Sequence, residues 1–159
     1  MVKEFSVRLP DEAATAGLGA ALAAGVAPGR VLHLRGELGT GKTTLVRGLL
    51  RALGYPGRVK SPSYTLVELY AISSLNLYHF DFYRFRDRSE WLNSGFRDYF
   101  NPDSVCIVEW PERAEDLLAA PDLEIALEFS GTGRAARIAA RTVAGEQWLA
   151  TLSASWPPA

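Results

Sequence analysis

The stretch LHLRGELGTGKTTLVRGLL, from Leu32 to Leu50, constrains the fold of this chain more than any other part of it. Between Gly36 and Thr43 it matches the phosphate-loop pattern G-x-x-x-x-G-K-[ST] without a mismatch. The pattern carries meaning only where a strand precedes the loop and a helix follows it. Both are predicted here, because the residues before the loop are apolar and those after it are amphipathic. The chain is therefore expected to contain the strand–loop–helix unit of an α/β protein.

The residue types of this loop suit the binding of phosphate groups. Glycines let the backbone curl around an anion where a side chain would collide, so that several N–H groups converge on it. The positive end of the following helix dipole points at the same anion. Lys42 is expected to reach the β- and γ-phosphates of a nucleotide, and the Thr43 hydroxyl to ligate Mg²⁺. The alternative is a glycine-rich turn that contains a lysine by chance, and the flanking strand and helix argue against it.

Length, charge and cysteine content narrow the class of protein. A chain of 159 residues with 48% hydrophobic residues is long enough for one domain with a substantial core. Its formal net charge of −1 gives no overall attraction to nucleic acid or to an anionic membrane. The single cysteine excludes a disulfide within the chain and agrees with a reducing compartment. No apolar run reaches the ~18 residues that a membrane span needs, and no signal-peptide pattern occurs, so a soluble cytoplasmic protein is expected.

Periodicity and turn residues predict the other elements. Asp11 is a natural N-cap for an alanine-rich helix, and Gly54 ends the helix after the phosphate loop. Residues 61–85 and 122–145 each predict a hairpin, while 86–100 is polar and either helical or irregular. Helices are expected at 12–26 and 42–54, and strands at 4–9, 30–36, 61–70, 75–85, 104–110, 122–129 and 134–145.

Together these elements predict a single α/β domain over residues 1–159. The expected architecture is a three-layer sandwich like that of phosphate-loop NTPases, with a mixed sheet whose core strands are parallel. Antiparallel hairpins are expected to extend this sheet. The last few residues of the chain, WPPA, are expected to be flexible.

A carboxylate near the metal is the second part that a phosphoryl-transfer site needs. Glu109 supplies one directly after the apolar run VCIV, where a strand is expected to end. The same position would suit an acidic residue that only caps an exposed strand end before Pro111. Next to a phosphate loop, the metal-binding role is the stronger interpretation.

Two further residues are candidates for the catalytic layer. In YHFDFYR, aromatic positions alternate with His79, Asp81 and Tyr83, which share one face of the strand. Asp81 could orient the attacking water or contact Mg²⁺ through a water; the alternative is a carboxylate hydrogen-bonded to a neighbouring strand. Thr65, in SPSYTLVE, could sense the γ-phosphate as switch residues do, or could be an ordinary β-branched strand residue.

An arginine run and a tryptophan remain open to more than one interpretation. Arg84, Arg86 and Arg88 could form a solvated face, a lid, or a docking patch for phosphate or tRNA. Trp110, directly after the strand that carries Glu109, could wall the site or anchor a partner.

Two properties separate the classes of protein that carry a phosphate loop: which base of the nucleotide is bound, and whether the terminal phosphate is released, transferred or retained. No N-K-x-D or T-K-x-D tetrapeptide occurs, so a GTPase is disfavoured and adenine is the better choice. A small-molecule kinase stays open, because kinases of this size share the loop and use arginine-rich lids like RFRDR. A module that uses nucleotide only as a structural ligand is a further alternative. The phosphate loop alone does not choose between these and an ATPase.

The order of the motifs resembles the bacterial TsaE family, also called YjeE. The matching segments span nearly the whole chain, and SPSYTLVE and HFDFYR are far more specific to that family than the phosphate loop is. The family usually has an acidic, leucine-containing stretch before GFRDYF, and from it only Glu90 carries over. The segments are LPDEAAT, GELGTGKTTLVRGLL, VKSPSYTLVELY, LYHFDFYR, GFRDYF, VCIVEWPE and GRAARI.

The resemblance implies a Mg²⁺-dependent ATPase that binds ATP or ADP and hydrolyses ATP weakly on its own. The family serves the synthesis of tRNA threonylcarbamoyladenosine (t6A) with the TsaB–TsaD pair, whose TsaD member performs the transfer, so contact with tRNA is indirect. By motif, Thr43 and Glu109 are expected to hold Mg²⁺. Lys42, Asp81 and Thr65 are expected to form the catalytic or switch layer. Nucleotide contacts are expected from Gly36 and from Asp11, Glu37, Leu38, Gly39, Thr40, Gly41, Lys42, Thr43, Thr44 and Gly133.

Overall fold

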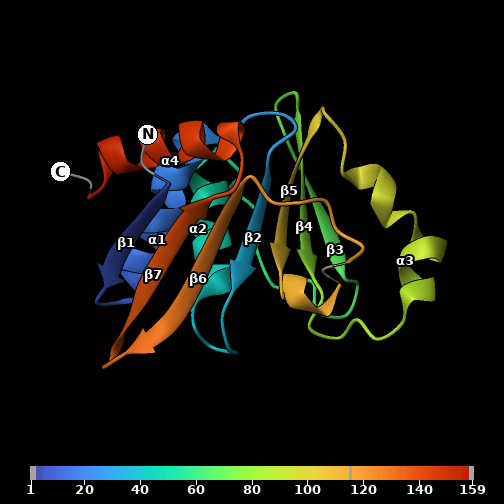
Figure 1. The fold of residues 1–159 in the computed structure, drawn as a ribbon, viewed down its shortest axis with the longest axis horizontal. Helices are drawn as coiled ribbons and strands as arrows, with labels where there is room; N and C mark the ends of the chain where they lie inside the picture. The colour runs from blue at the N-terminus through green and yellow to red at the C-terminus, as the bar shows by residue number, and fades with distance from the viewer. Residues whose placement is uncertain (1–2, 115, 158–159) are drawn as a thin grey trace.

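The computed structural model describes residues 3–114 and 116–157, and within these ranges seven strands form one mixed sheet (Figure 1). Their order across the sheet is β1-β7-β6-β2-β5-β4-β3. The neighbours β6, β2, β5 and β4 run parallel, whereas β7, β1 and β3 are added antiparallel, which confirms the predicted sheet. The strands are β1 Glu4–Leu9, β2 Val31–Arg35, β3 Val67–Ile72, β4 Leu75–Asp81, β5 Ser104–Glu109, β6 Leu123–Ser130 and β7 Gly133–Ala140.

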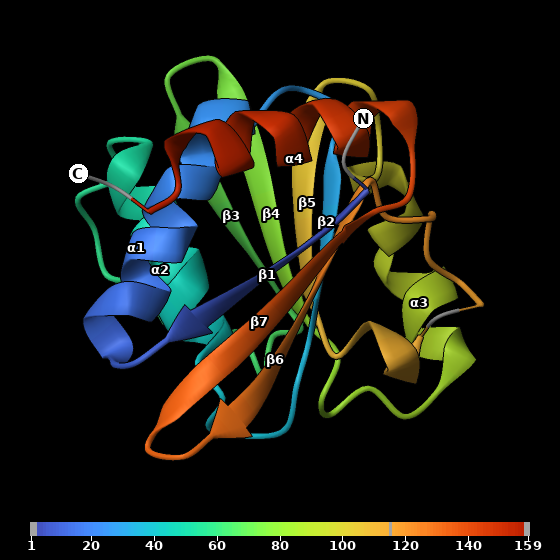
Figure 2. The same ribbon diagram turned by 60° about the vertical axis from the view of Figure 1, so that its left-hand side comes forward.

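Helices cover both faces of the sheet, so the described chain has the predicted three layers (Figure 2). Helices α1, α2 and α4 pack on one face, and α3 with a short 3₁₀ turn packs on the other. The α-helices are α1 Glu12–Leu22, α2 Lys42–Ala52, α3 Arg88–Ser94 and α4 Val143–Ser155, and the 3₁₀ turns are Ala23–Gly25, Phe96–Tyr99 and Pro111–Arg113.

The two faces of the sheet are packed with different kinds of side chain. Leucine, isoleucine and valine dominate the face under α1, α2 and α4. Aromatic rings, among them Phe80 and Phe82, dominate the face under α3. Successive side chains of a strand point to opposite faces, so His79 and Asp81 point toward the α2 face. The alternation in HFDF therefore places polar groups beside the phosphate loop.

The strand–loop–helix unit forms as predicted. Most of β2 is buried, and α2 begins at Lys42 after the loop. Leu45 and Leu49 are fully buried, and Leu53 packs against the same core. Gly54 follows with φ of 95°, a left-handed conformation that stops the helix.

Several predicted boundaries are wrong, and two of them have a clear local physical reason. The helix predicted at 12–26 ends at Leu22, and the chain turns where Gly25 lies against Trp148. A Cβ atom at Gly25 would lie 2.3 Å from Cδ1 of that ring. The strand predicted at 134–145 ends at Ala140, because the Thr142 hydroxyl accepts a hydrogen bond from an α4 backbone N–H and caps that helix.

The hairpin predicted over 61–85 forms, but its first strand begins late, at Val67, and its second strand ends early, at Asp81. Leu66 donates a backbone hydrogen bond to Pro62 O at 2.7 Å and has a φ of 69°, so the preceding residues form a compact turn.

Residues 86–100 contain both a helix and an irregular part. Helix α3 begins with a capping box in which the Asp87 and Glu90 side chains accept hydrogen bonds from backbone N–H groups.

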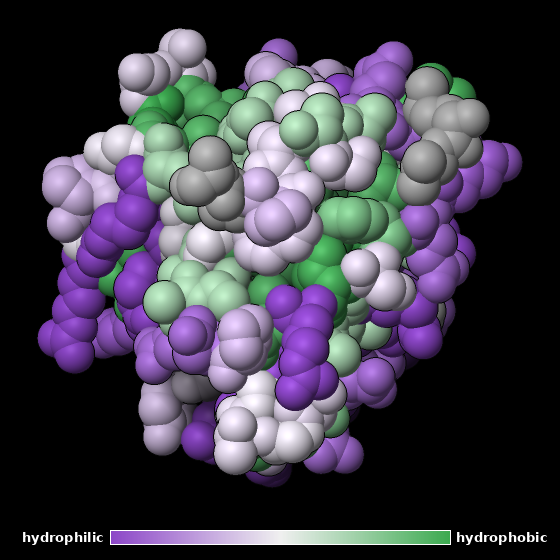
Figure 3. Space-filling model, turned by 90° about the vertical axis from the view of Figure 1, so that its left-hand side faces the viewer, coloured by the Kyte–Doolittle hydropathy of each residue, from purple (hydrophilic) through white to green (hydrophobic). Residues whose placement is uncertain are grey.

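Strand β1 forms one edge of the sheet, and the face seen from that side carries many hydrophilic side chains around a central apolar area (Figure 3). Along β1 the exposed positions are polar, at Glu4, Ser6 and Arg8, and alternate with half-buried apolar residues. Charged side chains on an edge strand disfavour pairing with another chain.

The last helix is followed by Trp156, which packs against the aliphatic core. Residues 158 and 159 of the WPPA tail, for which flexibility is predicted, lie outside the described residues. No helix in the described part of the chain combines the length and the apolar character of a membrane span.

Candidate functional site

The phosphate loop passes through backbone conformations that favour glycine. The φ angle is 82° at Gly39 and 105° at Gly41, in the left-handed region. The Thr40 hydroxyl donates a hydrogen bond to Glu37 O at 2.8 Å across the turn. A Cβ atom at Gly36 would lie 2.6 Å from Oγ1 of Thr40, so no side chain fits there. The three glycines of the loop, two of them fixed by the pattern, thus each meet a local requirement of its backbone.

Lys42 is the first residue of α2, and its side chain turns into the loop. Its Nζ donates to Gly36 O and, at 3.2 Å, to Glu37 O, and it lies 4.1 Å from the centre of the Trp110 ring. Burial lowers the pKa of Lys42 from its ordinary value, while neighbouring carboxylates act in the opposite direction, Glu109 most strongly. Trp110 therefore walls the loop, which was one of its two predicted roles.

Glu109 ends β5 and faces the first turn of α2. It is 2% exposed, and it is the register partner of Asp81 in the parallel β4–β5 pair. The Thr43 hydroxyl donates a hydrogen bond to Glu109 Oε2 at 3.0 Å. The two residues predicted to hold Mg²⁺ thus lie in direct contact, although they are 66 positions apart in the sequence.

His79 makes a second contact with the same carboxylate oxygen. Its Nε2 lies 2.6 Å from Glu109 Oε2, and its side chain is fully buried. Because an ionised carboxylate can only accept, we assign the proton of the ring to Nε2. The Nδ1 atom has no hydrogen-bond partner among the described residues. From sequence, His79 was expected only to share a strand face with Asp81.

Asp81 ends β4 and is held from two sides. Its Oδ1 accepts a hydrogen bond from Tyr83 N at 3.0 Å, and the Ser61 hydroxyl donates to its Oδ2. Ser61 belongs to the turn before β3, so this contact ties that turn to the carboxylate. No pattern singled out Ser61 in the sequence, apart from its place in SPSYTLVE.

One cavity brings these groups together, and we call it the carboxylate cavity. Its volume is about 290 Å³, and its walls come from the phosphate loop, the start of α2 and the ends of β4 and β5. The carboxyl ends of parallel strands meet at one edge of a sheet, which is why residues so distant in sequence converge here. Its lining consists of Leu38, Gly39, Thr40, Gly41, Lys42, Thr43, Thr44, Ser61, Asp81, Glu109 and Trp110.

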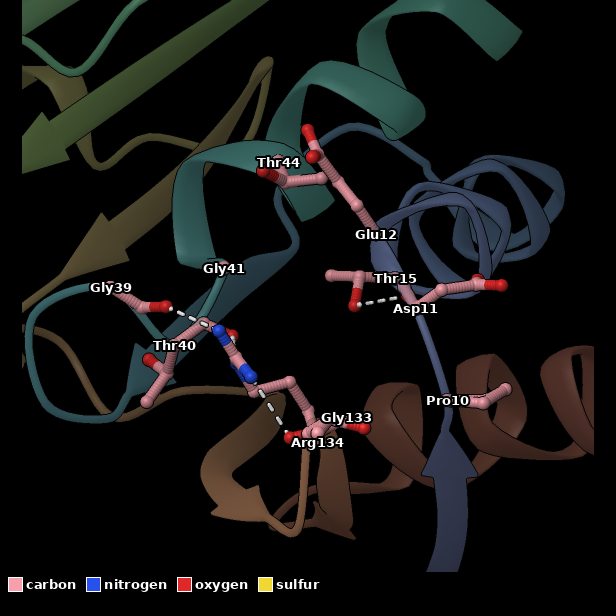
Figure 4. A pocket seen from close by; sticks show the side chains of 11 residues that line it. Pro10, Asp11, Glu12, Thr15, Gly39, Thr40, Gly41, Thr44, Gly133 and Arg134 are labelled. Carbon is pink, nitrogen blue, oxygen red and sulfur yellow. Dashed lines mark hydrogen bonds between the residues drawn. The ribbon is translucent and has the colours of Figure 1, made fainter.

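A second cavity of about 460 Å³ lies on the other side of the loop, and we call it the hairpin cavity (Figure 4). It shares four loop and helix residues with the carboxylate cavity, so one ligand could extend through both. Its volume is in the range of small-molecule sites. The lining consists of Pro10, Asp11, Glu12, Thr15, Gly39, Thr40, Gly41, Thr44, Thr132, Gly133 and Arg134.

The first residues of β7, in the hairpin that β6 and β7 form, lie directly against the phosphate loop and β1. Arg134 Nη2 donates to Gly39 O at 3.0 Å (Figure 4), and its Nε donates to Thr40 O at 3.2 Å. The guanidinium also lies over the Phe129 ring, at 4.6 Å from its centre. At Gly133 a Cβ atom would lie 2.6 Å from Leu9 O, so the backbones approach closely. Arg134 is a site residue that sequence reasoning missed.

The start of α1 closes the hairpin cavity. Asp11 lies at its rim, and its Oδ1 accepts a hydrogen bond from Ala14 N at 2.8 Å, as expected of an N-cap. Glu12 and Thr44 extend toward one another from α1 and α2 (Figure 4). Glu12 was not among the predicted residues, although it directly follows the recognised N-cap.

Three of the predicted nucleotide-site residues, Gly36, Glu37 and Thr65, line neither cavity. Glu37 is exposed, and its carbonyl oxygen holds the loop instead. Thr65 is also exposed, and its hydroxyl donates to Val67 O at 3.2 Å. The turn before β3 therefore presents Ser61, and not Thr65, to the carboxylate cavity.

The arginine run after β4 also lies outside both cavities. Arg84 stacks over the exposed Tyr64 ring, at 4.5 Å from its centre. Arg88 forms an ion pair with Asp116, and Arg86 is exposed. These contacts place the arginines on the surface rather than in a lid over the loop.

The donors in the carboxylate cavity suit Mg²⁺ that is bound together with a nucleotide. Among the described residues, no three His, Cys, Asp or Glu side chains cluster as a metal site. Mg²⁺ usually takes one or two protein oxygens and fills its other positions with phosphates and waters. The touching Thr43 hydroxyl and Glu109 carboxylate provide such a pair of oxygens.

Comparisons with known proteins cover the part of the chain that forms this site. The family model described as "Threonylcarbamoyl adenosine biosynthesis protein TsaE" matches residues 9–138, which include every residue that lines the two cavities. The chain is 42% identical over 123 residues to the tRNA threonylcarbamoyladenosine biosynthesis protein TsaE of Haemophilus influenzae, covering 77% of this chain and 78% of that protein. It is 38% identical over 130 residues to the TsaE protein of Bacillus subtilis, covering 82% and 81%.

The fold also has a solved counterpart. The crystal structure of Bacillus subtilis YdiB superposes with a TM-score of 0.83 and 32% sequence identity, and the superposition covers 97% of each chain. The mixed sheet and the arrangement of helices around the loop are therefore shared over 97% of each chain.

Proposed function

The chain belongs to the TsaE family of threonylcarbamoyl adenosine biosynthesis proteins, and from this premise we propose that it is the subunit that binds and hydrolyses ATP during t6A synthesis. It depends on Mg²⁺, works in the cytoplasm with the TsaB–TsaD pair, and leaves the transfer of the threonylcarbamoyl group to TsaD. Membership of the TsaE family supports the role in t6A synthesis. The geometry of the two cavities supports the binding and hydrolysis of a nucleotide.

The observation that carries the proposal is the convergence of Lys42, Thr43, Asp81 and Glu109 on one cavity. The loop N–H groups and Lys42 bind the β- and γ-phosphates. Thr43 and Glu109 hold Mg²⁺, which when bound neutralises the charge that develops on the phosphates.

Asp81 is the residue that orients the attacking water. Each carboxylate oxygen can accept two hydrogen bonds, so Asp81 can accept a hydrogen bond from the attacking water while it keeps its contacts with Ser61 and Tyr83 N. Those two contacts fix the carboxylate at the end of a rigid strand. Asp81 therefore meets the geometric need of a water-positioning group without taking part in phosphate binding.

The hairpin cavity takes the nucleoside. It continues from the phosphate loop, and its polar lining from α1 and β7 can bind ribose and base edges. Adenine is proposed because the chain has none of the tetrapeptides by which GTPases read guanine. The formal net charge of −1 fits a subunit whose partners hold the tRNA.

The test is the release of free phosphate from ATP by the purified chain, with and without TsaB–TsaD. Slow release that the pair stimulates, and that Lys42→Ala abolishes, is the expected result. A small-molecule kinase would instead consume ATP in proportion to a phosphorylated acceptor. No stimulation by the pair, together with normal t6A in cells that lack this protein, would overturn the proposal.

A further inference from the structure

His79 contacts the site without lining it. It lines neither cavity, and it is 0% exposed. Within the described residues, the one hydrogen bond that its side chain makes is to Glu109. A nucleotide therefore does not touch this ring. Any effect of His79 on the chemistry must pass through the Glu109 carboxylate.

Two donors approach one oxygen of that carboxylate from two elements. Thr43 Oγ1 on α2 lies 3.0 Å from Glu109 Oε2, and His79 Nε2 on β4 lies 2.6 Å from it. The last torsion of a glutamate side chain is broad, so the carboxylate plane is weakly defined without such contacts. Two donors from different directions select one orientation. No hydrogen bond reaches Oε1 from the described residues, which leaves that oxygen available.

The second ring nitrogen of His79, Nδ1, indicates why a histidine occupies this position. Nδ1 is buried and has no partner among the described residues, and Leu77 and Ile107, the nearest positions on the same face of the β4–β5 pair, belong to the aliphatic core. An apolar side chain would fill the position without burying an unpaired polar atom. The contribution that sets histidine apart from such a residue is the Nε2 hydrogen bond to Glu109.

We propose that His79 is a positioning residue for the metal site: it fixes the Glu109 carboxylate so that Oε2 stays with Thr43 and Oε1 faces Mg²⁺ or a water bound to it. The inference rests on the proposed function, because it assigns a partner to the same Mg²⁺–nucleotide site. Partners behind metal-binding carboxylates commonly change metal affinity by about 10–100-fold when they are removed.

Three variants separate positioning from packing. His79→Gln keeps an N–H donor with a similar reach, and His79→Met removes the donor while keeping an elongated side chain. Leu77→Val is the matched control, because Leu77 is fully buried on the same strand face and lines neither cavity. The Mg²⁺ concentration that gives half-maximal binding of ADP would be measured for each protein by calorimetry, with binding in EDTA as a reference.

Only His79→Met is expected to need about tenfold more Mg²⁺, with its binding of ADP in EDTA unchanged. His79→Gln is expected to stay within about threefold of the wild type because its donor is retained. If His79→Met folds and responds to Mg²⁺ like the wild type, His79 does not position the metal ligand. If His79→Gln loses as much Mg²⁺ response as His79→Met, the role is one of ring packing, and the proposal is likewise wrong.

A spectroscopic measurement on the unaltered chain covers the case in which a variant does not fold. The chain has two histidines, so nitrogen NMR of the imidazoles can be assigned with one His33→Asn variant. We expect the proton of His79 on Nε2, and a shift of that signal when Mg²⁺ is added to the ADP complex. A proton on Nδ1, or no shift, would overturn the inference while the proposed function stands. If the wild-type chain bound ADP with the same affinity with and without Mg²⁺, both this inference and the proposed function would be wrong.

Discussion

The two cavities beside the phosphate loop are built in different ways. The carboxylate cavity depends on buried side chains, Asp81 and Glu109, which end two central parallel strands. The hairpin cavity depends on backbone contacts at the edge of the sheet, where Gly133 meets Leu9 and Arg134 holds two loop carbonyls. The carboxylate cavity thus depends on two acidic side chains held in the core. The hairpin cavity depends on the close approach of the β7 backbone to β1 and the loop.

This difference separates two properties of the protein. Substitutions on the carboxylate side should change the dependence on Mg²⁺ or the rate of hydrolysis. Substitutions on the hairpin side should change nucleotide affinity by the same factor with and without Mg²⁺. Each prediction below tests whether the two sides are independent in this way.

The largest effect is expected for Asp81→Ala. Phosphate release should fall about 100-fold, because a group that orients the nucleophile is lost. Nucleotide affinity should stay within about threefold, since no phosphate contact is removed. Single-turnover hydrolysis and equilibrium binding of Mg²⁺–ADP measure the two quantities. An equal loss of binding and hydrolysis would show that Asp81 serves the ligand as a whole.

On the hairpin side, Gly133→Ala should weaken nucleotide binding about tenfold, in EDTA as well as in Mg²⁺. A Cβ atom there would lie 2.6 Å from Leu9 O, so the β1–β7 contact must open, at a cost of about 1–3 kcal/mol in stability. Binding and thermal unfolding are the measurements. Gly17→Ala is the control: its Cβ would lie 4.0 Å from Trp156, and alanine should stabilise the helix by about 0.5–1 kcal/mol.

A smaller effect is expected for Arg134→Met. The loss of two hydrogen bonds to the loop carbonyls should weaken nucleotide binding about fivefold, again without regard to Mg²⁺. The methionine retains apolar contact with Phe129, so the hairpin itself should remain folded. A change that appears only in Mg²⁺ would contradict the separation between the two sides.

The smallest effects compare two residues of one turn. Ser61→Ala should slow phosphate release about threefold, because it frees one oxygen of the Asp81 carboxylate. Thr65→Ala should leave the rate unchanged, since its hydroxyl bonds to a backbone oxygen on the surface. Steady-state phosphate release decides between them. A larger loss in Thr65→Ala would show that the turn rearranges when nucleotide binds.

The sequence predicted the parts of the site that depend on local pattern. The phosphate loop and the position of Glu109 at a strand end follow from short runs of residues, and so does the polar face that carries Asp81. The parallel core with antiparallel additions also followed, because the elements and their turns have strong local signals. That the whole chain forms a single domain stays a prediction.

The parts that the sequence did not predict depend on contacts between distant segments. His79 meets Glu109 only because β4 pairs with β5 in one register, and register is not visible in either strand alone. Arg134 reaches the loop only because β7 lies next to β6, beside β2. Thr65 was placed in the catalytic layer because its segment suited a switch residue, and the turn at Leu66, which leaves its side chain exposed, is not visible in that segment.

The place of β1 in the sheet has a consequence for the newly made chain. Within the described residues β1 pairs only with β7, which follows the other six strands of the sheet in chain order. The phosphate loop can form around its own strand and helix much earlier, but the hairpin side must wait for β7. A chain that has emerged from the ribosome only as far as α2 thus has the loop without a complete hairpin cavity. Contacts this distant in sequence also form slowly, so the hairpin cavity is complete only after β7 has been made and has paired with β1.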